Sequence, residues 1–303
     1  MSDPIRIGTR GSELALWQAN EVARRLISLG YDFQIVTVKT TGDKRHDVPL
    51  ASIGGKGLFV KELEEALERK AIDIAVHSLK DVPSIIPRQF ALAAFLERAD
   101  PRDAWLQPDG TPIEALPAGA VVGTSAPRRR AQILARFPGL KVEPIRGNVG
   151  TRVNKIRSRA YDAVVLASAG LTRLGRTSDI TSLFSVEEML PAAGQGIVAI
   201  EALSDNARAI DAVRRINHGP TEVAALCERG VLQSFGERLD CYSCIAVHAT
   251  VSNDQVSLRA FMSDYDATRV IRADARGRDD VAVSEVSKQL KRQGAVELLG
   301  VSA

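Results

Sequence analysis

The 303-residue sequence contains few cysteines and no long apolar run. Its three cysteines, Cys227, Cys241 and Cys244, are too few for a disulfide framework. They do not supply the four ligands of a structural zinc site, and the four histidines are scattered, so we expect no bound metal. No apolar stretch approaches the roughly 20 residues that cross a bilayer, and the N-terminus does not resemble a secretory signal. We therefore expect a cytoplasmic protein without a membrane partner.

Aromatic residues make up only 5% of the chain, and the net charge is only +3. Proteins that bind single-stranded nucleic acid usually offer aromatic stacking platforms in a basic groove, so we expect no nucleic-acid partner. The arginines are nevertheless clustered, with three in a row at 128–130 and six more between positions 146 and 176. Guanidinium groups pair bidentately with carboxylates and phosphates. The clustering therefore indicates an anion-binding site, although a solvated helix face explains some of these residues.

The first hundred residues alternate between strand and helix patterns. We expect strands at 6–9, 33–40 and 72–76, and helices at 12–29 and 59–70. Such alternation predicts a doubly wound α/β domain with a largely parallel sheet. Ligands of these sheets lie at the carboxyl ends of the strands, where the segments Arg10–Ser12 and His77–Asp81 fall.

The same pattern restarts after residue 103 and predicts a second α/β unit. A run at 197–200 is expected to return the chain to the first sheet, and from residue 222 the pattern is that of a small α+β domain. The chain length fits two or three domains. The predicted domains are residues 1–99 with 197–217, residues 100–196, and residues 218–303.

Seven segments, in order along the chain, resemble the porphobilinogen deaminase family. They are residues 9–18, 54–63, 73–83, 100–104, 122–129, 146–152 and 190–196. This resemblance implies two lobes like those of periplasmic binding proteins, with doubly wound, mainly parallel sheets. It also implies a small C-terminal α+β domain that carries a cofactor cysteine, and a monomer is expected because no long apolar patch or heptad repeat stands out.

The resemblance implies the activity of a hydroxymethylbilane synthase, which is a transferase. Enzymes of this family join four porphobilinogen molecules head to tail on a dipyrromethane primer, lose ammonia at each step and release a linear tetrapyrrole by hydrolysis. Every pyrrole carries an acetate and a propionate, which accounts for the many arginines. Asp81 is implied as the catalytic residue, because a carboxylate near the pyrrole N–H stabilises the electron-poor azafulvene and assists proton transfer. A surface ion pair or helix N-cap is the alternative role for Lys80 and Asp81.

The resemblance also implies two sets of binding residues. The cofactor would be held by Lys80, Asp81, Thr124, Ser125, Arg128, Arg129, Arg146 and Gly147. The substrate would be held by Arg10, Ser12, Lys56, Phe59, Ser78, Arg146, Arg152, Ala169, Arg173 and Gln195.

The cysteine loop departs from the family pattern. The family usually has two small residues before the anchor cysteine, whereas this chain has Leu239 and Asp240 before Cys241. The downstream sequence favours Cys241 as the anchor of the primer, and Cys244 is its competitor. Cys227 lies in an apolar helix and is expected to be a buried structural thiol.

A second departure lies before the paired arginines, where Ala126 and Pro127 replace a serine and a non-proline residue. One hydroxyl contact is expected to be missing, but a proline in the first turn of a helix is well tolerated. Two alternatives to the deaminase stay open. One is a two-lobed module that binds a small carboxylate, and the other is a degenerate deaminase that lacks the primer.

Overall fold

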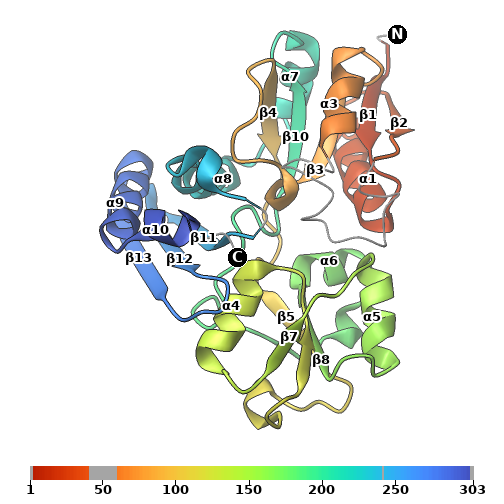
Figure 1. Cartoon of the computed structure of the whole chain (residues 1–303). Helices are drawn as coiled ribbons and strands as arrows, with labels where there is room; N and C mark the ends of the chain where they lie inside the picture. The colour runs from red at the N-terminus through yellow and green to blue at the C-terminus, as the bar shows by residue number, and fades with distance from the viewer. Residues whose placement is uncertain (1–2, 41–59, 241, 301–303) are drawn as a thin grey trace. The chain divides into compact units, whose positions relative to one another are not determined.

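The computed structural model describes most of the chain, namely residues 3–40, 60–240 and 242–300. The chain divides into two compact units (Figure 1). The first comprises residues 1–99 and 196–225, and the second comprises residues 100–195 and 226–303. Within the described ranges, no helix has both the length and the apolar character needed to span a membrane.

The first unit is built on a five-stranded sheet in the order β2-β1-β3-β10-β4. Its strands are β1 (Ile5–Thr9), β2 (Phe33–Thr37), β3 (Ile74–Ser78), β4 (Phe90–Phe95) and β10 (Val198–Leu203). β1 pairs in parallel with β2 and β3, whereas β10 is antiparallel to β3 and β4. Four strands therefore run in one direction. The predicted return of the chain to this sheet through residues 197–200 is confirmed.

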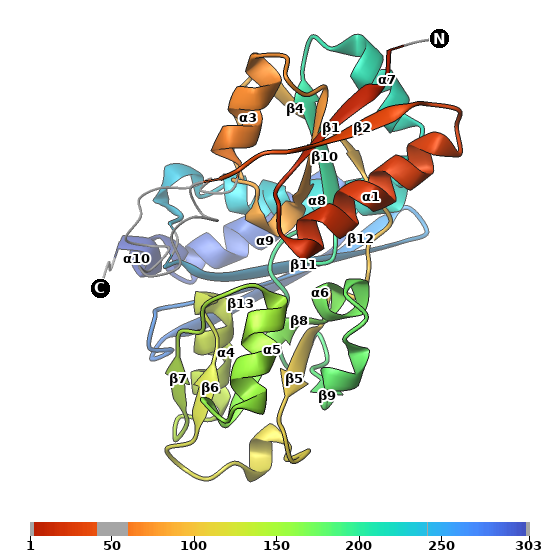
Figure 2. The same cartoon turned by 90° about the vertical axis from the view of Figure 1, so that its right-hand side faces the viewer.

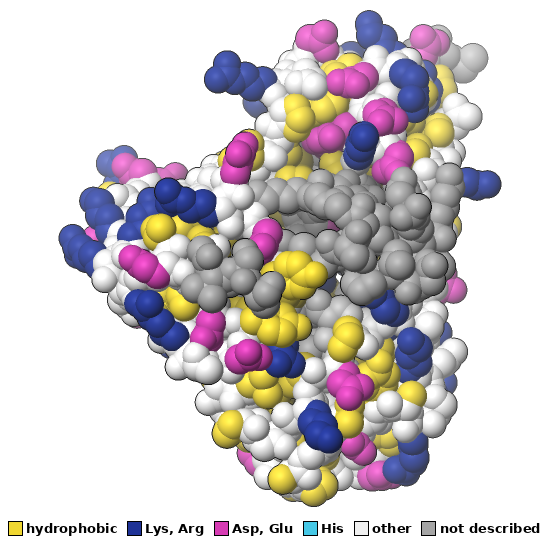
Figure 3. All heavy atoms as spheres, in the orientation of Figure 1, with side chains coloured by type: hydrophobic (Ala, Val, Ile, Leu, Met, Phe, Trp, Pro, Cys, Tyr) yellow, Lys and Arg dark blue, Asp and Glu magenta, His cyan; other side chains and the backbone are white. Residues whose placement is uncertain are grey.

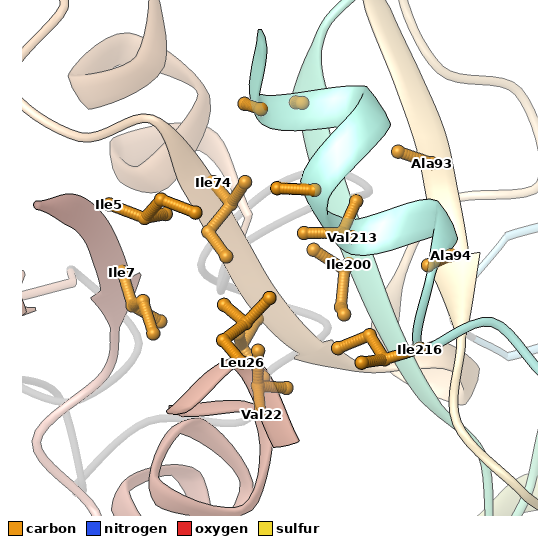
Figure 4. Close-up of a cluster of buried hydrophobic side chains, with 14 of the residues drawn as sticks. Ile5, Ile7, Val22, Leu26, Ile74, Ala93, Ala94, Ile200, Val213 and Ile216 are labelled. Atoms are coloured by element: carbon orange, nitrogen blue, oxygen red, sulfur yellow. The ribbon is translucent and has the colours of Figure 1, made fainter. Parts of the chain in front are cut away.

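Helices cover both faces of this sheet. Helices α1 (Glu13–Ile27) and α7 (Ala207–Arg214) pack on the face that carries Ile74, in the apolar cluster drawn in Figure 4. Helix α3 (Lys61–Glu68) packs on the opposite face, against Ala75. Ile74 and Ala75 lie on different faces because successive side chains of a strand point to opposite sides of the sheet. Figure 2 shows α1 running alongside β1 and β2, with which it is in contact.

Helix α1 begins as its sequence predicts. Ser12 is the N-cap, and its Oγ accepts a hydrogen bond of 3.3 Å from Ala15 N. Strand β3, however, lies two residues later than the predicted 72–76. Asp73 is held before the strand by Arg6, whose Nε and Nη2 donate to its carboxylate. His77 and Ser78 consequently belong to the strand and pair with β10.

The second unit repeats this topology in its sheet, which has the order β7-β6-β8-β5-β9. The strands are β5 (Asp103–Leu106), β6 (Val121–Gly123), β7 (Lys141–Glu143), β8 (Ala163–Ala167) and β9 (Ser182–Leu183). The helices are α4 (Pro127–Arg136), α5 (Val149–Arg157) and α6 (Ser168–Arg173). β6 is parallel to β7 and β8, and β5 is antiparallel to both of its neighbours. As in the first sheet, one strand is reversed.

The C-terminal part adds a three-stranded antiparallel sheet, covered by a helix (Figure 1). Its elements are α8 (Gly219–Gln233), β11 (Cys244–Ser252), β12 (Gln255–Ser263), β13 (Val270–Gly277), α9 (Asp279–Arg292) and α10 (Ala295–Gly300). This sheet packs against α4 through Ala131, Cys244 and Phe261. The predicted α/β class with a small C-terminal α+β part is confirmed. The division into three domains stays a prediction.

Candidate functional site

The carboxyl ends of β1 and β3 meet at one edge of the first sheet, because the two strands are parallel. Arg10 and Ser12 follow β1, Ser78 ends β3, and Asp81 ends the 3₁₀ turn that comes next. All four side chains line one pocket of about 60 Å³. The structure therefore brings together four of the residues that the sequence predicted for the site. His77 lines the same pocket.

Helix α1 fixes the pocket from one side. Gln18 is buried, and its Nε2 donates a hydrogen bond of 2.7 Å to Ser78 Oγ. Thr9 Oγ1 donates to Ala15 O at 3.0 Å, which ties the end of β1 to the first turn of the helix. The sequence analysis missed Gln18 as a pocket residue. The signal in the sequence was a polar residue on a helix face that is otherwise apolar.

Lys80 and Asp81 are exposed on the 3₁₀ turn Leu79–Asp81. Buried Leu79 anchors this turn, because its N donates to Ile197 O at 3.0 Å and its O accepts from Val82 N at 3.0 Å. Asp81 thus belongs to a turn held by the neighbouring strand and does not cap an α-helix. Lys56 and Phe59, the other residues predicted for this part of the site, lie outside the described residues.

A cluster of ionisable side chains lies on the α3 side of the sheet. His77 Nε2 is 3.0 Å from Glu201 Oε2, and both side chains are buried. Glu64 of α3 is half-buried beside this pair, and its burial and the Glu201 carboxylate raise its pKa to about 7. The sequence placed His77 at the end of a strand, and neither glutamate was predicted for the site.

The raised pKa of Glu64 predicts a pH-dependent stability. Between its ordinary pKa of 4.5 and about 7, the unfolded state has released a proton that the folded state keeps, so stability falls as the pH rises through that window. Glu64→Gln removes this loss. We expect it to leave the free energy of unfolding nearly unchanged near pH 4.5 and to raise it by about 1 kcal/mol at pH 8, after discounting for solvent screening.

Urea unfolding at pH 4.5 and pH 8 measures both values for Glu64→Gln. The matched control is Glu65→Gln on the same helix, where the carboxylate is 3.7 Å from Arg69 in a more exposed pair. The control should change stability slightly and equally at both pH values. A stability gain for Glu64→Gln that is the same at both pH values would contradict the expectation.

In the second unit, the predicted residues follow the parallel strands in the same way. Thr124 and Ser125 come after β6, Arg146 and Gly147 after β7, and Ala169 after β8. Ser125 Oγ donates to the carbonyl oxygen of residue 145 at 2.6 Å, so β6 and β7 remain joined beyond their ends. These residues therefore lie at one edge of the second sheet.

Gly147 has a backbone conformation that favours glycine. Its φ is +109°, and a Cβ at this position would lie 2.5 Å from Thr151 Cγ2. The carbonyl oxygen of Gly147 accepts from Arg152 Nε at 2.8 Å, and Asn148 caps α5 by accepting from Thr151 N at 2.8 Å. The turn between β7 and α5 is therefore closely packed. Arg173, also predicted for the substrate, ends α6.

Arg128 and Arg129 lie at the start of α4 and are both buried. They share the carboxylate of Asp103, which lies 2.6 Å from Arg128 Nη1 and 2.7 Å from Arg129 Nη2. Gln195 Nε2 also donates to Asp103, at 2.9 Å, while its Oε1 accepts from Arg128 Nη2 at 3.0 Å. Helix α4 begins at Pro127, so the proline does not displace the arginines.

Burial by itself would raise the pKa of Asp103, but the two guanidinium groups outweigh it and hold the pKa well below its ordinary value. Asp103 is thus a permanent anion between two cations. The sequence analysis predicted the arginines as ligand clamps and missed this partner. Both Nη atoms of Arg128 already donate within the unit, and a direct role for either arginine toward a ligand stays a prediction.

The two cysteines that the structure describes are both buried and free. Burial raises the pKa of the Cys227 thiol to about 11 and that of the Cys244 thiol to about 12. Cys244 begins β11 and packs against α4. Because the thiolate is the nucleophile, neither residue has the environment of a reactive cysteine. Cys241 lies outside the described residues.

A family model and several named relatives agree on one family. A family model described as "Porphobilinogen deaminase, dipyromethane cofactor binding domain" matches residues 5–211. The porphobilinogen deaminase of Acidithiobacillus ferrooxidans is 43% identical over 302 residues, which cover 99% of this chain and 98% of that protein. That of Nitrosomonas europaea is 43% identical over 310 residues and covers both chains fully.

A third porphobilinogen deaminase, from Geobacter sulfurreducens, is 46% identical over 275 residues, with 90% of this chain and 86% of that protein covered. Among solved structures, the methionine-binding protein MetQ is similar at 12% identity with a TM-score of 0.45, covering 70% of this chain and 89% of that one. The family model spans more than half of the chain, and the relatives are similar over almost all of it. The chain belongs to the porphobilinogen deaminase family.

Proposed function

We propose that this chain is a hydroxymethylbilane synthase that condenses four porphobilinogen molecules head to tail, with loss of ammonia, and then releases the linear tetrapyrrole by hydrolysis. The chain is an enzyme of the porphobilinogen deaminase type, a transferase. The observation that carries the proposal is the single pocket lined by Asp81, Arg10, Ser12 and Ser78. It combines one carboxylate with donors for the carboxylates of an acidic pyrrole.

The donors of the second unit fit the dipyrromethane cofactor of this family. The cofactor carries acetate and propionate groups, which call for guanidinium, hydroxyl and backbone N–H donors. Arg146 and Thr124 offer the first two kinds at one sheet edge, whereas the hydroxyl of Ser125 already donates to the carbonyl oxygen of residue 145. Gly147, whose φ is positive, has no side chain that would hinder the approach of a ligand to its backbone N–H. When bound, the dipyrromethane would supply the free pyrrole carbon that forms the first new bond, and it would anchor the chain whose terminal pyrrole forms the later ones.

Asp81 would act by charge. Loss of ammonia from the aminomethyl group leaves positive charge on the substrate pyrrole, and a fixed carboxylate near the ring N–H lowers the energy of that state. Arg10 in the same pocket would orient the substrate ring by pairing with the acetate or propionate that the ring carries. Holding the ring in this way lowers the entropic part of the barrier to bond formation, because the ring is already oriented when it is bound.

The test is intact mass under denaturing conditions on the wild type, Cys241→Ser and Cys244→Ser. We expect a covalent surplus of two pyrrole units on the wild type and on Cys244→Ser, and its loss in Cys241→Ser. The buried position and raised pKa of Cys244 support this choice of anchor. Cys244→Ser is the matched control, because it removes a thiol three residues away.

Loss of the surplus only in Cys244→Ser would keep the function and move the anchor. A wild-type chain that stays bare after incubation with porphobilinogen, and releases no ammonia, would contradict the proposed function. It would favour the degenerate deaminase or the carboxylate-binding module.

The monomeric state, the cytoplasmic location and the lack of a nucleic-acid or membrane partner stay predictions. On the face shown in Figure 3, lysine and arginine side chains of the described residues are interspersed with aspartate and glutamate. Binding of nucleic acid depends on a continuous basic surface, so this mixture supports the prediction.

A further inference from the structure

His77 and Glu201 form a buried pair directly against the pocket. In the register of β3 and β10, His77 is opposite Ala199 and Glu201 is opposite Ala75, so the two side chains project on the same face. Nε2 of His77 is 3.0 Å from Glu201 Oε2, and the histidine also lines the pocket that contains Asp81. The pair thus connects a buried carboxylate to the pocket through one imidazole ring.

The hydrogen bond to Glu201 involves one of the two ring nitrogens. A carboxylate can only accept a hydrogen bond, so in the tautomer that pairs with the carboxylate of Glu201, Nε2 carries the proton and Nδ1 of the neutral ring is an acceptor. Among the described residues, Nδ1 of His77 has no hydrogen-bond partner. A ring held in this way by a carboxylate is arranged to accept a proton at its second nitrogen, and the carboxylate stabilises the imidazolium that forms.

The charges around the ring favour this role. Glu201 has no exposed surface, and its Oε1 is a buried oxygen without a hydrogen-bond partner in the described part of the chain. A buried carboxylate with a free lone pair is costly unless positive charge is near. Among the described residues, other charged groups near the ring include Glu64 on α3, and Arg10 and Asp81 in the pocket.

We propose that His77 Nδ1 accepts the proton that leaves the pyrrole carbon after each new carbon–carbon bond has formed. This inference rests on the proposed function. In the step, the C–H bond of that ring carbon breaks, its electron pair restores the aromatic ring, and the proton moves to Nδ1. The imidazolium then gives this proton to the ammonia already released, which leaves as ammonium, and His77 returns to its neutral form.

The proposal divides the chemistry between two residues. The carboxylate of Asp81 stabilises positive charge, whereas His77 moves the proton. An imidazole is a stronger base than a carboxylate near neutral pH, which is why histidine is the commonest general base. Glu201 is a positioning residue, because it acts on the substrate only through the ring.

The experiment compares porphobilinogen with the same substrate carrying deuterium on its free pyrrole carbon. For His77→Gln we expect kcat to fall by about 100-fold or more, with KM little changed and with a primary isotope effect on kcat larger than that of the wild type. For Glu201→Gln we expect the same increase in isotope effect with a smaller loss of kcat. Intact mass should show the covalent primer on both variants.

The matched control is His248→Gln. His248 is another buried histidine beside a buried glutamate, with Nδ1 3.5 Å from Glu228 Oε1, but it belongs to the second unit and lies outside this pocket. Its replacement should lower stability and leave the isotope effect at the wild-type value.

A primer-loaded His77→Gln whose isotope effect equals that of the wild type would overturn the inference and leave His77 a structural role. If His77→Gln does not fold, Glu201→Gln decides the question by the same measurement. Failure of the proposed function is a different result, because the wild type itself would then carry no primer and release no ammonia.

Discussion

Asp81→Asn is expected to lower kcat by at least about 100-fold, with little change in KM. The asparagine has nearly the same shape and can still bind a pyrrole N–H, but it carries no negative charge. Asp81 lies on a turn anchored by buried Leu79, so the backbone of the pocket should not move. The loss should therefore appear in the step that develops positive charge, and binding should be spared.

Release of ammonia and formation of hydroxymethylbilane, followed over a range of porphobilinogen concentrations, measure both constants. Asp211→Asn is the control, since it removes an exposed aspartate of the same unit on α7, away from the pocket. Turnover of Asp81→Asn at the wild-type rate would show that the charge of this carboxylate is not needed. An increase in KM alone would mean that Asp81 binds substrate without acting in the chemical step.

The pocket of the first unit could be predicted because its residues follow strands of one parallel sheet. The alternation of strands and helices placed Arg10, Ser12, Ser78 and Asp81 at the same edge, and the structure groups them there. Local signals, such as the Ser12 N-cap and the apolar face of α1, were sufficient for these elements.

The buried ionic partners could not be predicted, because no local spacing connects them to the residues that they serve. Glu201 is 124 positions away from His77, and Asp103 is 25 positions away from Arg128. Each pair forms only when the sheet brings two strands, or a strand and a helix, together. A single sequence shows a charged residue at such a position but does not show that it is buried. For this reason the sequence predicted a ligand as the partner of Arg128 and Arg129, and it did not predict Asp103.

The buried partner of the arginines leads to the second large expected effect. Asp103→Asn should lower the free energy of unfolding by about 3–5 kcal/mol, because it leaves two buried guanidinium groups without their carboxylate. Asp103 has no exposed surface and is hydrogen-bonded by Arg128, Arg129 and Gln195. In a chain of this size, such a loss corresponds to a fall in Tm of roughly 5–8 °C.

The control is Asp100→Asn in the loop just before β5, where the carboxylate is 2.7 Å from Arg102 in a partly exposed pair. Such surface pairs are worth about 0–1 kcal/mol. If Asp100→Asn and Asp103→Asn lower the free energy of unfolding equally in urea at pH 7, burial of the ion pair does not increase its contribution to stability.

The pH dependence distinguishes a lost ion pair from a merely altered shape at Asp103. The pKa of Asp103 is lowered in the folded state, so its contribution to stability is complete above its ordinary pKa and disappears as the pH falls toward the folded value. The difference between wild type and Asp103→Asn should therefore be constant from about pH 6 to pH 8 and should shrink below about pH 4. A difference that stays the same at low pH would assign the loss to packing. A difference that shrinks would identify Asp103 as the counter-ion that permits two arginines to be buried at the start of α4. Those arginines could then bind a ligand only through N–H donors that are not already bonded to Asp103.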